Sequence, residues 1–353
     1  MRQRALQTVL LVHAIEQTDP AGDALSLIDR AHASGEAADG RPFPAAGQGP
    51  AQIDGDSERM LARRADTLLA RLRVRSPGVD RVLAAAAGPT GLDRVILLLG
   101  FVLGVGIAFA GGSRIDVFAY PLIGLVLWNL IVYIVLIGRT FNSPRQIVPP
   151  AGGAAAGGAA AVWHDGFLRR WLARLYANRV RARLDALTTH SIGFNAPLVP
   201  GLRRFAADWC EVGQPLFRER ARRLLHLAAI LAAVGLMAGY GLRGWVLRQT
   251  AGWGTTVFGP GSAHAALVTL YGFASAVSGV PIPQAQDLQA LAWTSPTTGG
   301  GPAGQWVHLI IWTALLYIVL PRLIAVLVTT VSLWRRSATL RMPPSMWQRS
   351  RET

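Results

Sequence analysis

Apolar residues gather into four long runs, and these runs predict helices that cross a membrane. At about 1.5 Å of helix per residue, each run is long enough to span a hydrocarbon layer roughly 30 Å thick. The runs lie at residues 94–112, 117–138, 224–242 and 306–334. They predict an all-α fold class: a polytopic membrane protein with four transmembrane helices and further helical segments on the cytoplasmic side.

Arginine is concentrated on one side of these runs. Segment 139–223 has fourteen arginines against five acidic residues, and the tail 335–353 has five against one. Segment 243–305 has only two arginines. Because arginine-rich flanks stay in the cytoplasm, we expect both termini and segment 139–223 to face the cytoplasm, and segment 243–305 to face the opposite side.

The N-terminal region, residues 1–93, is followed at once by Arg94, and the first 94 residues balance twelve arginines with twelve acidic residues. Helical periodicity at 24–34 and 58–75 predicts two helices. Between them the Gly-, Pro- and Ala-rich stretch 35–56 predicts a mobile linker, and a second Gly/Ala linker is expected at 149–161.

The segment between the third and fourth runs contains the moderately apolar stretch 263–280. An interfacial or re-entrant helix is the favoured interpretation, and a short transmembrane span is the alternative. Tryptophans in this segment are expected at the membrane interface. They are Trp245, Trp253, Trp293 and Trp306.

A helix over 166–188 is the clearest element outside the runs, because leucines recur there at intervals of three and four residues. Its arginines could dock an acidic partner or anionic lipid, or could simply be solvated on a helix that faces a core. These residues are Arg169, Arg170, Arg174, Arg179, Arg181 and Arg183.

Within the runs, small residues predict close helix packing, in one bundle or in a homo-oligomer. They are Gly100, Gly104, Gly235 and Gly239. Polar groups at depth are Asn129, Tyr133 and Arg322. Asn129 is expected to bond across helices or to line a permeation path. Arg322 could snorkel to the headgroups if the last span ends near Val326, and would need a buried partner if it continues to Trp334.

Composition narrows the chemistry. The mean hydropathy is +0.33, the net charge is +15 and lysine is absent, which excludes lysine-dependent catalysis and a Walker A lysine. The single cysteine, Cys210, excludes an internal disulfide and a cysteine-based zinc cluster. Because no catalytic motif is found, we expect no enzyme, no cofactor and no metal site. The basic residues flank the membrane runs, so nucleic acid is not an expected partner.

Several local strings resemble a family of bacterial inner-membrane proteins of unknown function. They lie at Pro121–Tyr133, Arg222–Ala229, Gly239–Gly244, Gly252–Trp253, Trp306–His308 and Pro321–Arg322. The resemblance covers about residues 90 to 335 and implies a place in the inner membrane, with segment 243–305 in the periplasm. Members are often encoded beside a predicted Era-like GTPase, which implies a GTPase as a cytoplasmic partner.

Two functions follow from these observations. The first is a non-enzymatic membrane anchor or scaffold whose basic cytoplasmic regions dock a cytoplasmic protein, in particular a GTPase. The alternative is an oligomeric channel or transport subunit with Asn129, Tyr133 and Arg322 along a central path. No intramembrane carboxylate is found in the runs, which disfavours a proton-coupled transporter acting alone.

Overall fold

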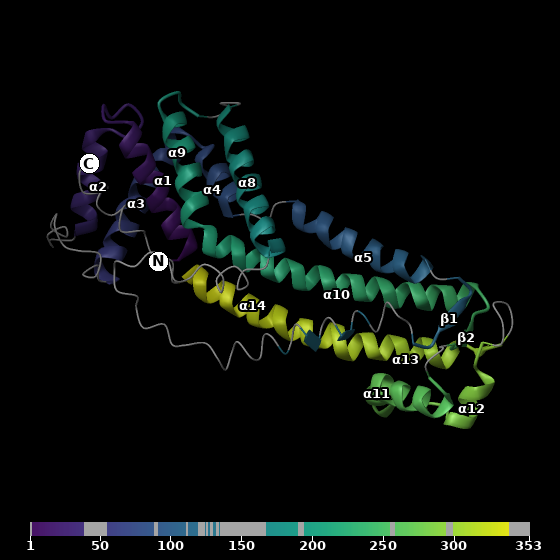
Figure 1. The fold of residues 1–353 in the computed structure, drawn as a ribbon. Coiled ribbons are helices and arrows are strands. Elements are labelled where there is room, and N and C mark those ends of the chain that lie inside the picture. The colour runs from purple at the N-terminus through teal and green to yellow at the C-terminus, as the bar shows by residue number, and fades with distance from the viewer. Residues whose placement is uncertain are drawn as a thin grey trace, which may run out of the picture. The chain divides into compact units, whose positions relative to one another are not determined.

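The structure, a computed structural model, describes most of the chain, and this part is mainly helical (Figure 1). The described residues are 2–38, 55–87, 91–110, 112–118, 124, 126–127, 130–131, 134, 167–189, 194–254, 258–293 and 299–338. The chain divides into two compact units, which are described separately. One comprises Met1–Leu92, Ala159–Arg222 and Thr329–Thr353, and the other Asp93–Gly158 and Arg223–Val328.

The first unit is a helical bundle assembled from segments on both sides of the first two apolar runs. Its helices are α1 (Gln3–Thr18), α2 (Leu27–Ala38), α3 (Gly55–Arg75), α4 (Val79–Ala87), α8 (Phe167–Thr189) and α9 (Leu198–Val212). Leu10, Leu72, Phe205 and Trp209 are fully buried at its centre. The Trp209 indole donates a hydrogen bond to the Ala86 carbonyl (3.1 Å). The N-terminal region therefore completes its core with helices from segment 139–223.

Helix α9 begins at Leu198 although Pro200 and Gly201 follow at once. Proline is tolerated there because the N–H groups of the first helical turn have no partner within the helix. Gly201 allows a close approach to α1. A Cβ at this position would lie 2.8 Å from the Cα of Ile15. Asp208, Cys210 and Glu211 thus belong to a helix packed on α1, not to a loop.

The second unit is built on α5 (Leu92–Ala110) and α10 (Gln214–Val246), which run side by side (Figure 1). Helix α10 is continuous from Gln214 to Val246, so the predicted third span, 224–242, is the middle part of a longer helix. Its last turns expose apolar side chains, and Trp245 is 89% exposed.

The final helical segment contains a local change of helix type. Helix α13 (Gly304–Ala314) continues through the π-helix η2 (Leu315–Val319) into α14 (Leu320–Ala338). The Leu320 N–H bonds the Leu315 carbonyl, five residues earlier. Pro321 explains this widening, because proline lacks an N–H and its ring clashes with the carbonyl four residues before it.

The structure also contains a small three-stranded sheet, which the predicted all-α fold class did not include. Its strands are β1 (Arg114–Asp116), β2 (Thr250–Gly252) and β3 (Gly301–Pro302), with β1 parallel and β3 antiparallel to β2. Periodicity could not predict strands of two or three residues, because such short strands carry no repeating pattern.

The tryptophans of segment 243–305 have different environments. Trp253 and Trp306 are buried beside the sheet with Tyr271, so their rings pack within the protein. Their place at the membrane interface stays a prediction. The polar edge of Trp253 needs no water, since its indole N–H donates to the Leu288 carbonyl at 2.7 Å.

The same segment forms α11 (Pro260–Ser278) and α12 (Ala285–Ala290). Helix α11 includes most of the predicted 263–280 helix. It is followed by Gly279, whose φ of 72° is the left-handed conformation that favours glycine at a helix end.

Three helical stretches are long and apolar enough to cross a membrane, by length and composition. They lie within Val79–Ala110, Gln214–Val246 and Gly304–Arg335. This indicates a membrane protein. Four membrane-crossing helices were predicted, and three are found among the described residues. The predicted second run, 117–138, falls mostly outside these residues and stays a prediction.

Candidate docking surface

Helix α8 buries one face in the first unit and exposes the other. Leu172, Tyr176, Val180 and Leu184 are almost fully buried, and they recur at the three- and four-residue intervals of one helix face. The helix therefore belongs to the bundle core, as the solvated-helix interpretation requires. Its apolar face is already covered and cannot also insert into lipid.

The opposite face combines a tryptophan with arginines. Trp171, Arg174, Asn178 and Arg181 are exposed at spacings of three, four and three residues, which aligns them in one stripe along the helix. Trp171 is 49% exposed. We call these four residues the α8 stripe. Tryptophan and arginine are the residue types that dominate the energetics of protein interfaces.

Sequence analysis missed Trp171, although its spacing to Arg174 was visible. The leucine pattern was used to define the buried face, and the exposed face was judged by charge alone. The position of Trp171, on the side of the helical wheel opposite the buried face and three residues before Arg174, was the signal that could have found it.

The six arginines of α8 do not form one patch. Arg170, Arg174 and Arg181 lie within about 40° of one another around the helix, whereas Arg179 and Arg183 lie on its other flank. Arg169 is half-buried and has a polar contact within the protein. The structure therefore brings together three of the six as a basic edge beside the tryptophan.

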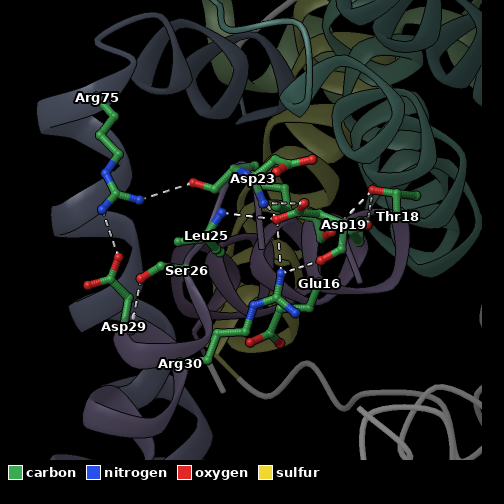
Figure 2. Close-up of polar contacts among 12 residues, drawn as sticks. Glu16, Thr18, Asp19, Asp23, Leu25, Ser26, Asp29, Arg30 and Arg75 are labelled. Carbon is green, nitrogen blue, oxygen red and sulfur yellow. Dashed lines mark hydrogen bonds and ion pairs between the residues drawn. The ribbon is translucent and has the colours of Figure 1, made fainter. Parts of the chain in front are cut away.

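Arginines of the N-terminal helices, by contrast, are held by buried carboxylates. Asp19, at the end of α1, accepts hydrogen bonds from the backbone N–H groups of Asp23, Ala24 and Leu25 (Figure 2). It also accepts a 2.9 Å hydrogen bond from Arg30. Burial opposes ionisation of Asp19, but these donors outweigh it and hold its pKa below the usual value.

Asp29 joins α2 to α3 in the same cluster. Arg71 and Arg75 both form ion pairs with its carboxylate, the second at 2.9 Å, and Arg75 also donates to the Ala24 carbonyl (Figure 2). Hydrogen bonds from Ser26 and Arg71 lower the pKa of Asp29, and they prevail over its partial desolvation.

A third buried carboxylate, Glu16, pairs with Arg64 through two hydrogen bonds, of 3.0 and 2.5 Å. Arg64 also donates to the Ser34 hydroxyl at 2.9 Å, so it connects α1, α2 and α3. The arginines of this cluster stabilise the bundle and are not available to a partner.

Several arginines of α8, by contrast, are not held by carboxylates of the described residues. Within the described part of the chain, Arg170, Arg174 and Arg179 have no carboxylate partner, and Arg181 approaches Asp185 only at 4.0 Å, in an exposed pair. Exposed pairs of this kind contribute little free energy. The charges of Arg170, Arg174 and Arg179 are therefore available to an external negative charge.

Cys210 lies on α9 beside α8, where its thiol donates to the Ala177 carbonyl at 3.5 Å. Burial raises the pKa of this thiol, which makes it a poor nucleophile at neutral pH. Among the described residues, no group of three His, Cys, Asp or Glu side chains could hold a metal ion.

The predicted intramembrane polar residues are only partly placed. Asn129 and Tyr133 lie outside the described residues. Arg322 is half-buried and lies in a helix that continues to Ala338, so the helix itself does not end near Val326. The depth of Arg322 in the membrane stays a prediction.

The four glycines lie between α5 and α10. A Cβ on Gly100 would lie 2.7 Å from the Ala228 carbonyl oxygen, and one on Gly104 would overlap the backbone of Ala232. Gly235 and Gly239 face the backbone of Phe101 and Val105 in the same way. The glycines thus bring two helices of one chain into backbone contact.

A comparison with protein families identifies the chain. The model of a family described as "Protein of unknown function (DUF2868)" matches residues 170–350, just over half of the 353 residues. The chain belongs to the DUF2868 family. The match begins at Arg170, so the part shared with the family contains the α8 stripe. No curated protein and no solved structure matches the chain.

Proposed function

We propose that this DUF2868 protein is a non-enzymatic anchor in the bacterial inner membrane that docks a cytoplasmic protein through the α8 stripe. The observation that carries the proposal is the exposed Trp171 beside Arg174 and Arg181. An aromatic ring and exposed guanidinium groups on a rigid helix are suited to a partner with a complementary acidic surface.

Charge distribution supports the orientation. Arginine-rich segments flank the apolar helices on the side that includes α8, and this side is the cytoplasm by the positive-inside rule. The cluster around Asp19, Asp29 and Glu16 is a less suitable docking surface than α8, since these carboxylates engage Arg30, Arg64, Arg71 and Arg75.

An acidic protein is favoured over anionic lipid as the partner of α8. A helix that lies on a membrane inserts an apolar face into the lipid, but the apolar face of α8 is buried against the bundle. A GTPase is the partner class that the family resemblance suggests. The proposal itself requires only a partner with exposed carboxylates.

The test compares two triple variants with the same change in net charge. In the stripe variant, Arg170, Arg174 and Arg181 become Glu. In the control variant, Arg4, Arg81 and Arg203 become Glu. All three control residues are exposed in the same unit, outside α8. Tagged full-length protein is purified from native membranes, with and without a non-hydrolysable GTP analogue, and bound proteins are identified by mass spectrometry.

We expect a soluble partner with the wild type and the control variant, and its loss with the stripe variant, while both variants still insert in the membrane. Trp171→Ala should weaken the purified complex by about 2 kcal/mol, or roughly thirtyfold in Kd. Equal recovery with both triple variants would refute docking through α8. A homo-oligomer without any soluble partner would instead favour the channel alternative.

A further inference from the structure

Helix α11 exposes an uncharged surface. Val268, Phe273 and Val277 are all exposed, Phe273 by 54%, and the remaining exposed positions of the helix are Ala, Gly, Ser or Thr. The chain has no Asp, Glu, Lys or Arg between Arg248 and Asp287. Charged residues normally occupy the water-facing side of a surface helix, so this face is not adapted to water.

Aromatic contacts place α11 against the last membrane-crossing stretch. The ring of Tyr271 packs against Trp306 near the start of α13, with centroids 6.2 Å apart. The ring of Phe273 packs against Tyr317 in η2 at 6.1 Å. Tyr317 follows the start of α13 by about 20 Å of helix, so the contact with Phe273 lies well inside the membrane-crossing stretch.

The exposed face of α11 continues an apolar surface of that stretch. One turn beyond Tyr317, the exposed side chains of Leu320, Leu323 and Ile324 begin the apolar face of α14. A helix of the Gly304–Arg335 stretch must expose such a face to acyl chains if it crosses the membrane. Phe273 therefore lies at the edge of a surface of the same chemical character.

Both ends of the α11 segment meet at one place. Before α11, the Trp253 N–H donates to the Leu291 carbonyl (3.3 Å), and the Trp293 N–H donates to the Trp253 carbonyl (2.8 Å). The residues that lead into α11 are thus bonded to those that follow α12. The chain enters and leaves this element on the same side, which excludes a single crossing that ends on the opposite side.

Several backbone polar groups of the return segment after α11 have partners within the protein. The carbonyls of Val280, Pro281 and Pro283 approach side chains of Ser275 (2.6 Å), Gln305 (3.4 Å) and His264 (2.9 Å), respectively. The Val280 N–H donates to the Ser278 hydroxyl at 3.2 Å. Pro281 and Pro283 have no N–H group to satisfy.

Non-helical backbone is tolerated at membrane depth only where its N–H and C=O groups have partners within the protein. The return segment meets this condition at Val280, Pro281 and Pro283, through three side chains contributed by α11 and α13. In water these side-chain bonds would add little, because water would satisfy the same carbonyls.

We propose that α11 and residues 279–284 form a re-entrant element that dips into the membrane, with Val268, Phe273 and Val277 against lipid acyl chains. The occupant of this face is the lipid of the surrounding membrane. Neither water nor a second copy of the chain covers it.

The test measures what surrounds single sites in the full-length protein in liposomes. In a Cys210→Ser background, nitroxide labels are attached to Phe273→Cys and Val277→Cys. Leu323→Cys, on the apolar face of α14, is the lipid reference, and Gln286→Cys, exposed on α12, is the water reference. Power saturation then reports collisions with oxygen, which dissolves in lipid, and with a water-soluble nickel chelate.

We expect the labels at 273 and 277 to match the Leu323→Cys label. Their collision rate with nickel should be at least about tenfold below that at 286, because a polar complex partitions poorly into hydrocarbon. Frequent nickel collisions at both sites would overturn the proposal in favour of water. Infrequent collisions with both reagents would overturn it in favour of a protein partner. If Phe273→Cys does not fold, Val268→Cys replaces it.

Discussion

Arg243 of α10 donates a hydrogen bond to the backbone carbonyl of Ala108, in the last turn of α5. A second guanidinium N–H reaches the carbonyl of Gly112, just after that helix. The side chain is 3% exposed and lies 5.9 Å from the centroid of the Phe109 ring. A positive charge at a helix C-terminus is favourable, and a buried carbonyl needs a donor. Arg243 therefore completes the end of α5 from a different helix.

Arg243→Met should destabilise the second unit, because it leaves two carbonyls without their donors. Each buried acceptor that loses its partner costs about 1–3 kcal/mol. The melting temperature of the detergent-solubilised protein should fall accordingly. Arg248→Met, which removes an exposed arginine five positions later, should leave it nearly unchanged. Equal effects of the two substitutions would show that the carbonyl bonds contribute nothing.

Gly104→Ala should separate α5 from α10, since the new methyl group would overlap the Ala232 backbone. Overpacking of this kind costs about 1–3 kcal/mol. Gly106→Ala in the same helix is the matched control, because nothing lies within 4 Å of its Cβ position. Thermal unfolding with size-exclusion detection measures both variants. A loss of stability in the Gly106 variant as large as that in the Gly104 variant would contradict packing within the chain.

Asp19→Ala should loosen the turn between α1 and α2 far more than Asp80→Ala loosens α4. Removing Asp19 leaves Arg30 nearly buried without its carboxylate, which costs about 3–5 kcal/mol. Asp80 pairs with Arg73 at the surface, and loss of an exposed pair costs about 1 kcal/mol or less. Hydrogen exchange measured by mass spectrometry should show faster exchange at Asp23–Leu25 only in the Asp19 variant. Unchanged protection there would refute the role assigned to this carboxylate.

The stability of the first unit should decrease in acid. Asp19 and Asp29 have pKa values below the ordinary 3.8 in the folded protein, so the unfolded chain binds more protons as the pH falls. Their contribution is complete above the ordinary pKa and is lost as the pH drops below it. Melting temperatures between about pH 3 and pH 6 should fall at the acidic end for the wild type and less for Asp19→Ala with Asp29→Ala. An identical acid slope in both proteins would contradict this assignment.

Thr313→Val should stabilise the protein. Thr313 is 0% exposed at the end of α13, and its hydroxyl has no hydrogen-bond partner. Valine has nearly the same shape and removes the cost of burying that hydroxyl, a gain of about 1–3 kcal/mol. The exposed Thr269→Val, whose hydroxyl bonds the Ala265 carbonyl, should change the melting temperature little. A lower melting temperature for Thr313→Val would reveal a polar partner for this hydroxyl.

Repeating patterns of apolar residues predicted the helices in which such a pattern is present. The apolar runs predicted α5, α10 and the α13–α14 stretch, and the leucine spacing predicted α8, because amphipathicity repeats within each helix. Helix α9 was not predicted, and Pro200 and Gly201 stand in its first turn. Proline is harmless in a first turn, however, and the glycine is used for contact with Ile15.

Features that depend on distant residues could not be predicted in this way. The shared core of the first unit joins Ala86 to Trp209, and the small sheet joins Ile115 to Ala251. Neither contact leaves a periodic trace in the sequence. The engagement of the N-terminal arginines was hidden for the same reason. Arg64 finds Glu16 across 48 positions, so charge counts alone could not tell which arginines remain available to a partner.

The hydrogen bond from the Tyr271 hydroxyl to the Val117 carbonyl, at 2.8 Å, also fixes an order of events during synthesis. The two residues are 154 positions apart. At about 5–20 residues per second, the ribosome needs roughly 8 to 30 seconds to make the later partner after the earlier one. For most of that interval α5 is complete, while strand β1 waits for β2 and Arg243 has yet to be translated. The nascent chain must therefore hold its first membrane helix without the contacts that later close its end, which is when protection from misfolding and proteolysis matters most.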